Sequence, residues 1–385
     1  MPRPRKITVK KYLTDEEVDN LEGKWIDESY MKLPVINYNC DVYYKDDEGN
    51  EKLLLKFRKN CISQSLLRTG WQSYKDLAKP SRGRGASAGP IDKEGVYWKK
   101  RNIVNTGKWS TGYLTPEGNK MKEEYDDFEE EELRKMINDL EIKFNENDIK
   151  SKDDLVHLII KKKNGVSKMK VNNQVASNPI GFYESSRNFA ELPCRLTHFT
   201  RTNYKKYNDG LPFIQKIDNM FKKLIPESYE KQLKRADEKT HLKIPGTAFS
   251  TITINRNFRT ALHKDAGDFS LGFGNLSVIE RGKYHGGYTV FPQFGVGVDV
   301  RSGDFLAMDV HQWHSNTAIV ETQEDKIFND KMDKAFNDNP LVGTVGLDKN
   351  YTRLTFVCYL REKILKCPDS IDPRFLKESG HNKIK

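Results

Sequence analysis

The 385-residue sequence contains little cysteine and no long apolar run. Its five cysteines are scattered, and none of them forms a Cys-x-x-Cys pair, which argues against a disulfide framework and against a zinc site built from cysteine. Such sparse cysteine suits a reducing, intracellular setting. No stretch of about 18 apolar residues occurs, and no apolar run follows the basic N-terminus. We therefore expect a soluble, intracellular protein that is neither secreted nor inserted in a membrane, working in the nucleus or with DNA in the cytoplasm.

Most of the chain also lacks an excess of charge of either sign. The net charge is +10, but residues 52–108 alone carry 14 basic and 3 acidic residues, so the remainder is close to neutral. This distribution excludes a charge coating of the histone type and favours a localised anionic partner. We expect this charged segment to lie well outside the site that carries the chemistry below and to hold the substrate.

Within this basic segment, residues 81–90 read SRGRGASAGP and predict a loop, because they show no apolar periodicity. On such a glycine-rich backbone, Arg82 and Arg84 can approach phosphates closely and pair with them bidentately. Aromatic and basic residues then alternate at 98–101 and 108–109, an arrangement that suits stacking on bases beside a charged backbone. We predict that residues 1–120 form a basic N-terminal region that contacts nucleic acid; the alternative is a solvated surface loop.

Residues 121–165 form a second segment, predicted to be an acidic linker followed by a small helical hairpin. Eight of the ten residues 123–132 are acidic, which is typical of a linker or of the first turn of a helix. Apolar residues at helical spacing over 133–140 and 155–160 predict two short helices. The pair loosely resembles the SAP helix–loop–helix motif of DNA-binding proteins, with a plain helical spacer as the alternative.

The sequence pattern of residues 170–385 predicts a β-rich domain with flanking helices. We therefore expect the α+β fold class for the protein. After an amphipathic stretch at 213–223, short β-branched or aromatic runs are broken by Gly, Pro and Asp. The predicted strands are 248–257, 276–280, 288–291, 296–300, 305–309 and 354–360. Short strands without helices between them favour an antiparallel sandwich or barrel over a βαβ fold.

The chemistry is carried by a small set of His, Asp and Arg residues. His263 and Asp265 are predicted at the end of a strand, where residues two apart face the same side and can meet one ion. His311 and His314 supply candidates for a third ligand. Two imidazoles and one carboxylate form the facial triad of non-haem Fe(II) oxygenases, although zinc hydrolases can use the same ligands.

A later arginine distinguishes the two metal chemistries. Arg353 begins the last predicted strand, with Thr355 two residues on and facing the same way. An arginine here suits the distal carboxylate of 2-oxoglutarate, because Arg–carboxylate pairing is bidentate and directional. The combined pattern favours an Fe(II)/2-oxoglutarate site over a set of unrelated polar loop residues.

Three motifs of this sequence resemble the oxygenase domain of the TET and base-J-binding-protein (JBP) family. They are HKDAGD at 263–268, SGDFLAMDVHQWHSNT at 302–317 and RLTFVCY at 353–359. The resemblance covers about residues 245–361 and implies a double-stranded β-helix, or jelly roll. It also implies Fe(II) held by His263, Asp265 and His314, with 2-oxoglutarate and O2 as co-substrates and Arg353 at the 2-oxoglutarate. His314 is preferred over His311 because the family's ligand directly precedes a turn of small residues.

This family hydroxylates the methyl group of 5-methylcytosine or thymine in nucleic acid. The resemblance implies that Tyr359 stacks on a base flipped out of the duplex, since a stacked methyl group cannot reach a buried iron whose oxidant abstracts its hydrogen. Asp268 stands where the vertebrate enzymes have a base-contacting asparagine. An aspartate can accept from cytosine N4 or from thymine N3, so the base stays open.

Two further departures concern the insert and the zinc region. The 39 positions from His314 to Arg353 include a charged, helical insert at 321–339, which we interpret as decoration rather than as a lid. The Cys-rich zinc region of the vertebrate enzymes is absent. We expect a monomer that acts on DNA, with ascorbate as an alternative reductant. The other hypotheses are an RNA base oxygenase, a prolyl or lysyl hydroxylase of proteins, and an inactive nucleic-acid-binding homologue.

Overall fold

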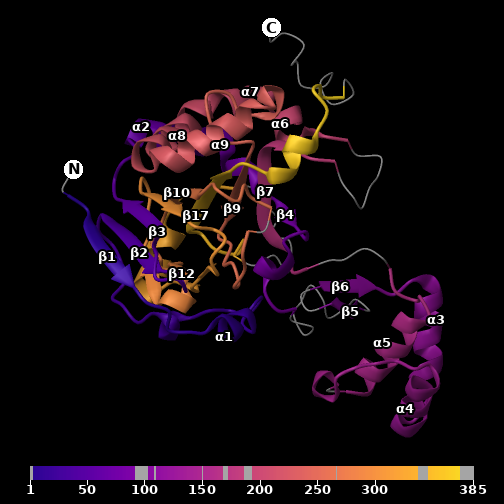
Figure 1. Cartoon of the computed structure of the whole chain (residues 1–385). Coiled ribbons are helices and arrows are strands. Elements are labelled where there is room, and N and C mark those ends of the chain that lie inside the picture. Colours follow the sequence, from indigo (N-terminus) through magenta and orange to yellow (C-terminus); the bar gives the residue numbers. More distant parts are fainter. Residues whose placement is uncertain are drawn as a thin grey trace.

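The computed structural model describes residues 3–91, 103–107, 110–149, 151–167, 172–185, 193–265, 267–336 and 346–372 (Figure 1). The alternating aromatic and basic residues at 98–101 and 108–109 lie outside these described ranges. No helix in the described part of the chain is long and apolar enough to cross a membrane.

A large sheet of ten strands forms the centre of the molecule. Its order is β1-β2-β3-β14-β10-β17-β9-β7-β4, with β8 pairing to β7. The strands are β1 (Arg5–Val9), β2 (Cys40–Lys45), β3 (Glu51–Arg58), β4 (Pro80–Ser81), β7 (Val175–Tyr183), β8 (Arg195–Leu196), β9 (Thr251–Arg256), β10 (Gly274–Arg281), β14 (Phe305–Met308) and β17 (Thr352–Tyr359). Among these described strands only β1 and β2 pair in parallel, which confirms the antiparallel prediction.

A smaller layer of short strands packs against one face of this sheet. It consists of β12 (Thr289–Phe291) between β13 (Val296–Val298) and β15 (Ser315–Asn316), with β11 (His285–Gly286) paired to β16 (Ile319–Val320). Leu276 and Leu306 of the large sheet share one apolar cluster with Phe291 and Val296 of the small layer. These two facing layers are the double-stranded β-helix expected from the sequence motifs.

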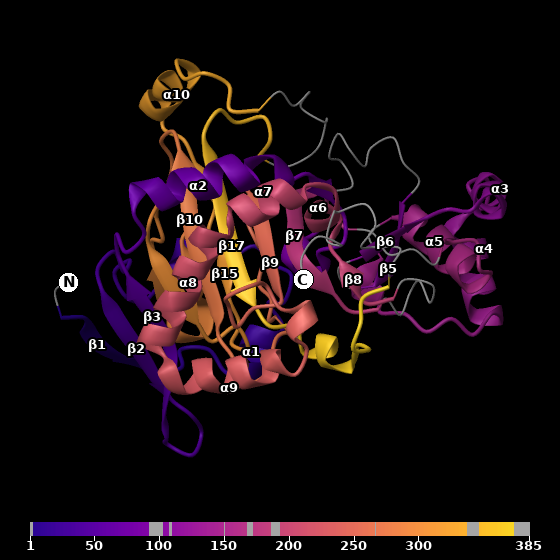
Figure 2. The ribbon, with the colours of Figure 1, turned by 90° about the horizontal axis from the view of Figure 1, so that it is seen from above.

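Helices cover the opposite face of the large sheet (Figures 1 and 2). They are α2 (Gln64–Tyr74), α6 (His198–Thr202), α7 (Tyr204–Asp209), α8 (Leu211–Leu224) and α9 (Pro226–Asp237). Phe213 and Ile217 of α8 pack on Leu354 and Phe356 of β17 in a second apolar core. Because alternate residues of a strand face opposite sides, Arg353, three residues before Phe356, is turned to the other face of the sheet.

The N-terminal strands belong to the same sheet as the strands of residues 170–385. β3 pairs with β14, with Phe57 opposite Leu306. Strands from both sides of the boundary predicted at residue 120 therefore share one sheet. An apolar run in β3 predicts a strand, but nothing local in the sequence identifies a partner some 250 residues away.

Three helices and a hairpin form a separate unit beside this body (Figure 1). They are α3 (Pro116–Tyr125), α4 (Glu130–Asp139) and α5 (Lys152–Lys162), with β5 (Ile103–Gly107) and β6 (Ser110–Tyr113). Leu133, Ile137, Leu155 and Ile159 lie in its core, so the two predicted helices are present, with α3 as an additional one. The acidic run ends α3 and supplies the first turn of α4. A SAP-like role in DNA binding stays a prediction.

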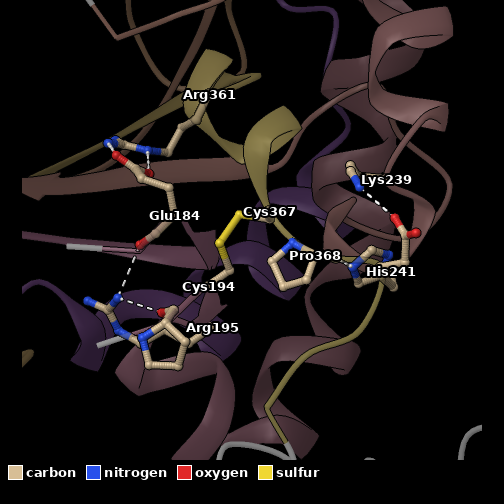
Figure 3. The surroundings of a disulfide bond; sticks show 10 residues. Glu184, Cys194, Arg195, Lys239, His241, Arg361, Cys367 and Pro368 are labelled. Atoms are coloured by element: carbon tan, nitrogen blue, oxygen red, sulfur yellow. Dashed lines mark hydrogen bonds and ion pairs between the residues drawn. A yellow bond between two sulfur atoms is a disulfide. The ribbon is translucent and has the colours of Figure 1, made fainter. Parts of the chain in front are cut away.

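A disulfide joins Cys194, beside β8, to Cys367, which follows the 3-10 turn η7 (Glu362–Lys366) (Figure 3). The scattered spacing of the cysteines gave no sign of this bond, because the fold brings together two residues 173 positions apart. The other three cysteines, Cys40, Cys61 and Cys358, are free and buried. The protein therefore has one disulfide bond and no disulfide framework.

Candidate active site

His263, Asp265 and His314 form one cluster on the side of the large sheet that faces the small layer. Their ligand atoms all lie within 4.8 Å of one another, an arrangement that could hold a metal ion. Nε2 of His263 lies 3.6 Å from one Asp265 oxygen, and Nε2 of His314 lies 3.7 Å from the other. Both imidazoles thus present the same ring nitrogen toward a single carboxylate.

Backbone carbonyls set the orientation of both rings. Nδ1 of His263 lies 2.7 Å from the Ala261 carbonyl oxygen, and Nδ1 of His314 lies 2.9 Å from that of Gln312. Because a carbonyl oxygen only accepts, each Nδ1 carries the proton and each Nε2 keeps a lone pair for a metal. Burial lowers the pKa of His314 to about 4, with a further contribution from His263, so this ring is neutral at physiological pH.

The sequence placed His263 at the end of a strand, and the structure corrects this. β9 ends at Arg256, and His263 forms an isolated bridge with His314 instead. His311 lies outside the cluster, with its Nε2 3.3 Å from the Phe269 carbonyl oxygen. The geometry therefore agrees with the choice of His314 over His311.

The cluster opens into a cavity of about 480 Å³ between the two layers. One wall of the cavity is formed by two neighbouring strands, through Thr253 and Asn255 of β9 and through Thr355 and Tyr359 of β17. None of the described residues of the insert at 321–352 lines this cavity. Its helix α10 (Gln323–Asp330) projects from one end of the large sheet (Figure 2).

The glycine-rich loop forms another part of the cavity wall, which the sequence did not reveal. The cavity is lined by Gly83 to Ser87 together with His263, Asp265 and His314, which we call the metal cluster because they could hold a metal ion. The Ala261 N–H donates to the Ser87 carbonyl at 2.9 Å. Gly85 has a φ of 52°, a conformation that favours glycine. The basic segment is thus not separate from the chemistry in space, although no spacing in the sequence indicates the contact.

The two arginines of this loop have different surroundings. Arg84 lines the cavity. Arg82 donates from Nη1 to the Tyr113 hydroxyl at 2.8 Å, next to the hairpin β5–β6. Only Arg84 is therefore placed beside the metal cluster.

Arg353 is buried on the cavity-facing side of β17, and its side chain is 3% exposed. Its Nη2 has no hydrogen-bond partner within the described part of the chain. A buried guanidinium donor of this kind is costly unless an acceptor pairs with it, so the site fits an anionic group such as the distal carboxylate of 2-oxoglutarate. Thr355, two residues on, faces the same side and lines the cavity.

Asp268 and Tyr359, the residues expected to contact the base, both line the cavity. Oδ2 of Asp268 is buried and has no partner among the described residues; burial and the nearby Asp265 raise the pKa of this carboxyl well above its usual range. The Tyr359 hydroxyl lies 3.0 Å from Oγ1 of Thr253, and burial raises its pKa to about 12. Both groups therefore favour the neutral form.

The sequence reasoning missed Arg361, a further cation of the cavity wall. It lies two residues beyond Tyr359 and forms a double ion pair with Glu184, close to the Cys194–Cys367 disulfide (Figure 3). Continuing the alternation of β17 two residues past its end could have identified it, since 355, 357, 359 and 361 all line the cavity.

Comparisons with known proteins agree with this site. Residues 178–362 match the family model Tet_JBP, the oxygenase domain of the 2OGFeDO superfamily. The match begins well before the resemblance carried by the sequence motifs. Over 186 residues, 48% of this chain, the identity is 31% to a bifunctional helicase and thymine dioxygenase JBP2 of Leishmania major. Over 181 residues, 47% of this chain, it is 34% to thymine dioxygenase JBP1-B of Trypanosoma cruzi (strain CL Brener).

These alignments span only part of the relatives, 14% of the Leishmania protein and 19% of the Trypanosoma protein. A solved structure, NgTET1 in complex with 5mC DNA, aligns over 96% of this chain and 100% of that chain with 11% identity and a TM-score of 0.43. Likeness at that level carries no information on substrate.

A double-stranded β-helix that encloses a His-Asp-His cluster, with a buried arginine on the same side of the sheet, has the features of the 2-oxoglutarate/Fe(II) oxygenase class, and the matched superfamily implies these two cofactors. Residues 178–362 of this chain are therefore similar to the oxygenase domain of the TET/JBP family in sequence.

Proposed function

We propose that this chain hydroxylates the methyl group of a pyrimidine base in DNA. One observation carries the proposal: a single cavity of about 480 Å³ is lined by the metal cluster, by Tyr359 and Asp268, and by the arginine-bearing loop. An oxidation site and a phosphate-binding loop are what base oxidation in DNA requires in one place.

His263, Asp265 and His314 would hold Fe(II), and Arg353 with Thr355 would hold 2-oxoglutarate. When bound, the iron and 2-oxoglutarate supply the activation of O2 that C–H hydroxylation needs. The chain's own contribution is orientation. The carbonyls of Ala261 and Gln312 fix both imidazoles.

The base would enter this cavity flipped out of the helix. Tyr359 offers an aromatic face, while Asp268 and Arg361 offer polar groups to the base edge. Arg82 and Arg84 would contact the phosphates that flank the flipped nucleotide.

Thymine is the first base to test, because the curated relatives are named thymine dioxygenases. 5-Methylcytosine is the second, since a buried aspartate does not choose between the two. The RNA and protein hydroxylase hypotheses, the monomeric state and a role for ascorbate stay predictions.

The test is nucleoside mass analysis after incubation of the protein with Fe(II), 2-oxoglutarate and either thymine-containing DNA, methylated DNA or RNA. We expect a hydroxymethyl pyrimidine from DNA together with succinate, and neither product from a His263→Ala variant. Succinate without any oxidised base in all three substrates would contradict the proposal and favour a protein substrate.

A further inference from the structure

A second cavity, of about 440 Å³, lies across β9 from the catalytic one. Asn255 lines the catalytic cavity, whereas the next residue, Arg256, lines this second one, as the alternation of a strand requires. Lys75 and Lys79 contribute from the segment that leads into β4, and Lys334 contributes from the insert. We call this cavity the basic pocket.

Specific contacts hold the residues of the basic pocket in place. Arg256 is 4% exposed, and its guanidinium carbon lies 3.4 Å from the centre of the Phe336 ring. Lys75 donates from Nζ to the Ala335 carbonyl at 3.2 Å, so cations on the core hold the insert in place. The Lys79 backbone is anchored to β7, its N–H donating to Oδ1 of Asn178 at 2.8 Å.

Positive charge is in excess here. Among the described residues that line the basic pocket, the three lysines Lys75, Lys79 and Lys334 outnumber the one carboxylate, Asp76, which already pairs with Lys206 at 3.0 Å. Lys79 and Lys334 are exposed, and neither forms an ion pair with any residue of the described ranges. Several cations around one concavity concentrate potential and favour a multiply charged anion such as a phosphate.

The path of the chain connects the basic pocket to the catalytic cavity. Pro80 lines the former and Gly83 lines the latter. Three extended residues span at most about 10 Å, so these parts of the two linings lie close together near β4, at the edge of the sheet, although the cavities lie on opposite faces. The basic pocket also uses Lys334, in the insert by which this sequence departs from the usual family pattern.

We propose that the basic pocket binds backbone phosphates of a nucleic acid whose target base occupies the catalytic cavity. This choice of ligand rests on the proposed function. The insert would then enlarge the surface that contacts the substrate, although none of its described residues lines the catalytic cavity. A free phosphate compound shares the chemistry and is distinguished by the test below.

The test compares a Lys79→Gln/Lys334→Gln variant of the full chain with a Lys205→Gln/Lys231→Gln control. The control removes the same charge from exposed lysines that pair with Asp209 and Glu227 within their own helices. Fluorescence anisotropy with labelled duplex DNA gives affinity at several salt concentrations. We expect several-fold weaker binding and a slope of log affinity against log salt that is shallower by about two for the pocket variant. The control and a Lys79→Arg/Lys334→Arg variant should keep the wild-type slope.

A pocket variant with the wild-type slope would overturn the inference. If its DNA binding is unchanged but protection of the fold by inorganic pyrophosphate is lost, the pocket holds a free phosphate compound, and the nucleic-acid assignment is wrong. Nucleoside analysis on the wild-type protein separates the two proposals. Oxidised base with unchanged slopes rejects only the pocket, whereas a shallower slope without oxidised base rejects only the proposed function.

Discussion

His263 and His314 exchange two backbone hydrogen bonds, each N–H donating to the other residue's carbonyl oxygen at 3.0 Å. The two imidazoles are 51 positions apart in sequence, yet their ring centres lie 4.4 Å from each other. Because main-chain bonds set this spacing, it does not depend on a metal to draw the side chains together. The backbone preorganises the cluster, which is what a reactive metal site needs.

Replacing His263 with alanine should abolish both Fe(II) binding and succinate formation. The variant leaves one imidazole and one carboxylate, too few ligands to hold the ion firmly. The matched control is His311→Ala, whose ring lies outside the cluster and should retain metal. Metal content and succinate release check both variants; undiminished turnover by His263→Ala would reject the ligand assignment.

Arg353→Lys should raise the KM for 2-oxoglutarate by about tenfold or more, since a lysine cannot pair bidentately with a carboxylate. Affinity for DNA should not change, because Arg353 is buried and is not part of the glycine-rich loop that we expect to contact the phosphates. Titrating 2-oxoglutarate in the succinate assay measures the effect. An unaltered KM would remove Arg353 from the co-substrate site.

Asp268→Ala should separate co-substrate turnover from base oxidation. The carboxyl is the polar group that we assign to the base edge, and its loss should lower base oxidation about tenfold, the effect of one lost hydrogen bond to the substrate. Iron binding and slow uncoupled succinate formation should remain, because the metal cluster does not include Asp268. The ratio of hydroxymethyl base to succinate gives the result, and equal losses of both products would place Asp268 in the metal site instead.

The sequence allowed six of the strands and the His-Asp-His cluster to be predicted, because both depend on local patterns in the sequence. The runs of β-branched and aromatic residues correctly predicted six strands, namely β9, β10, β12, β13, β14 and β17. The ligands His263 and Asp265 lie in one short motif, and His314 directly precedes a turn of small residues.

The remaining features depend on contacts between distant segments. Ser87 meets Ala261, Phe57 lies opposite Leu306 and Cys194 bonds to Cys367 only after the sheet has formed. No periodicity or composition at either partner marks such pairs, since register and tertiary packing select them. This is why the glycine-rich loop was expected to lie apart from the metal, and why a disulfide was not expected.

Replacing Arg82 and Arg84 with glutamine should weaken DNA binding and make its salt dependence shallower by about two. Arg84 lines the catalytic cavity, so the single Arg84→Gln variant should also lower base oxidation at saturating DNA. Fe(II) binding should be unchanged in both variants. Anisotropy across a salt series checks the slope, and a slope equal to that of the wild-type protein would reject phosphate contact by the loop.

Removing the Cys194–Cys367 bond should lower the free energy of unfolding by about 2–4 kcal/mol, because an open chain gains entropy in the unfolded state. The bond lies beside the Arg361–Glu184 ion pair of the cavity wall, so its loss should also loosen that wall (Figure 3). Urea unfolding of a Cys194→Ser/Cys367→Ser variant measures the loss. Dithiothreitol should destabilise the wild-type protein by a similar amount and leave the variant unaffected, and a wild-type protein indifferent to the reductant would show that the two thiols are not bonded in solution.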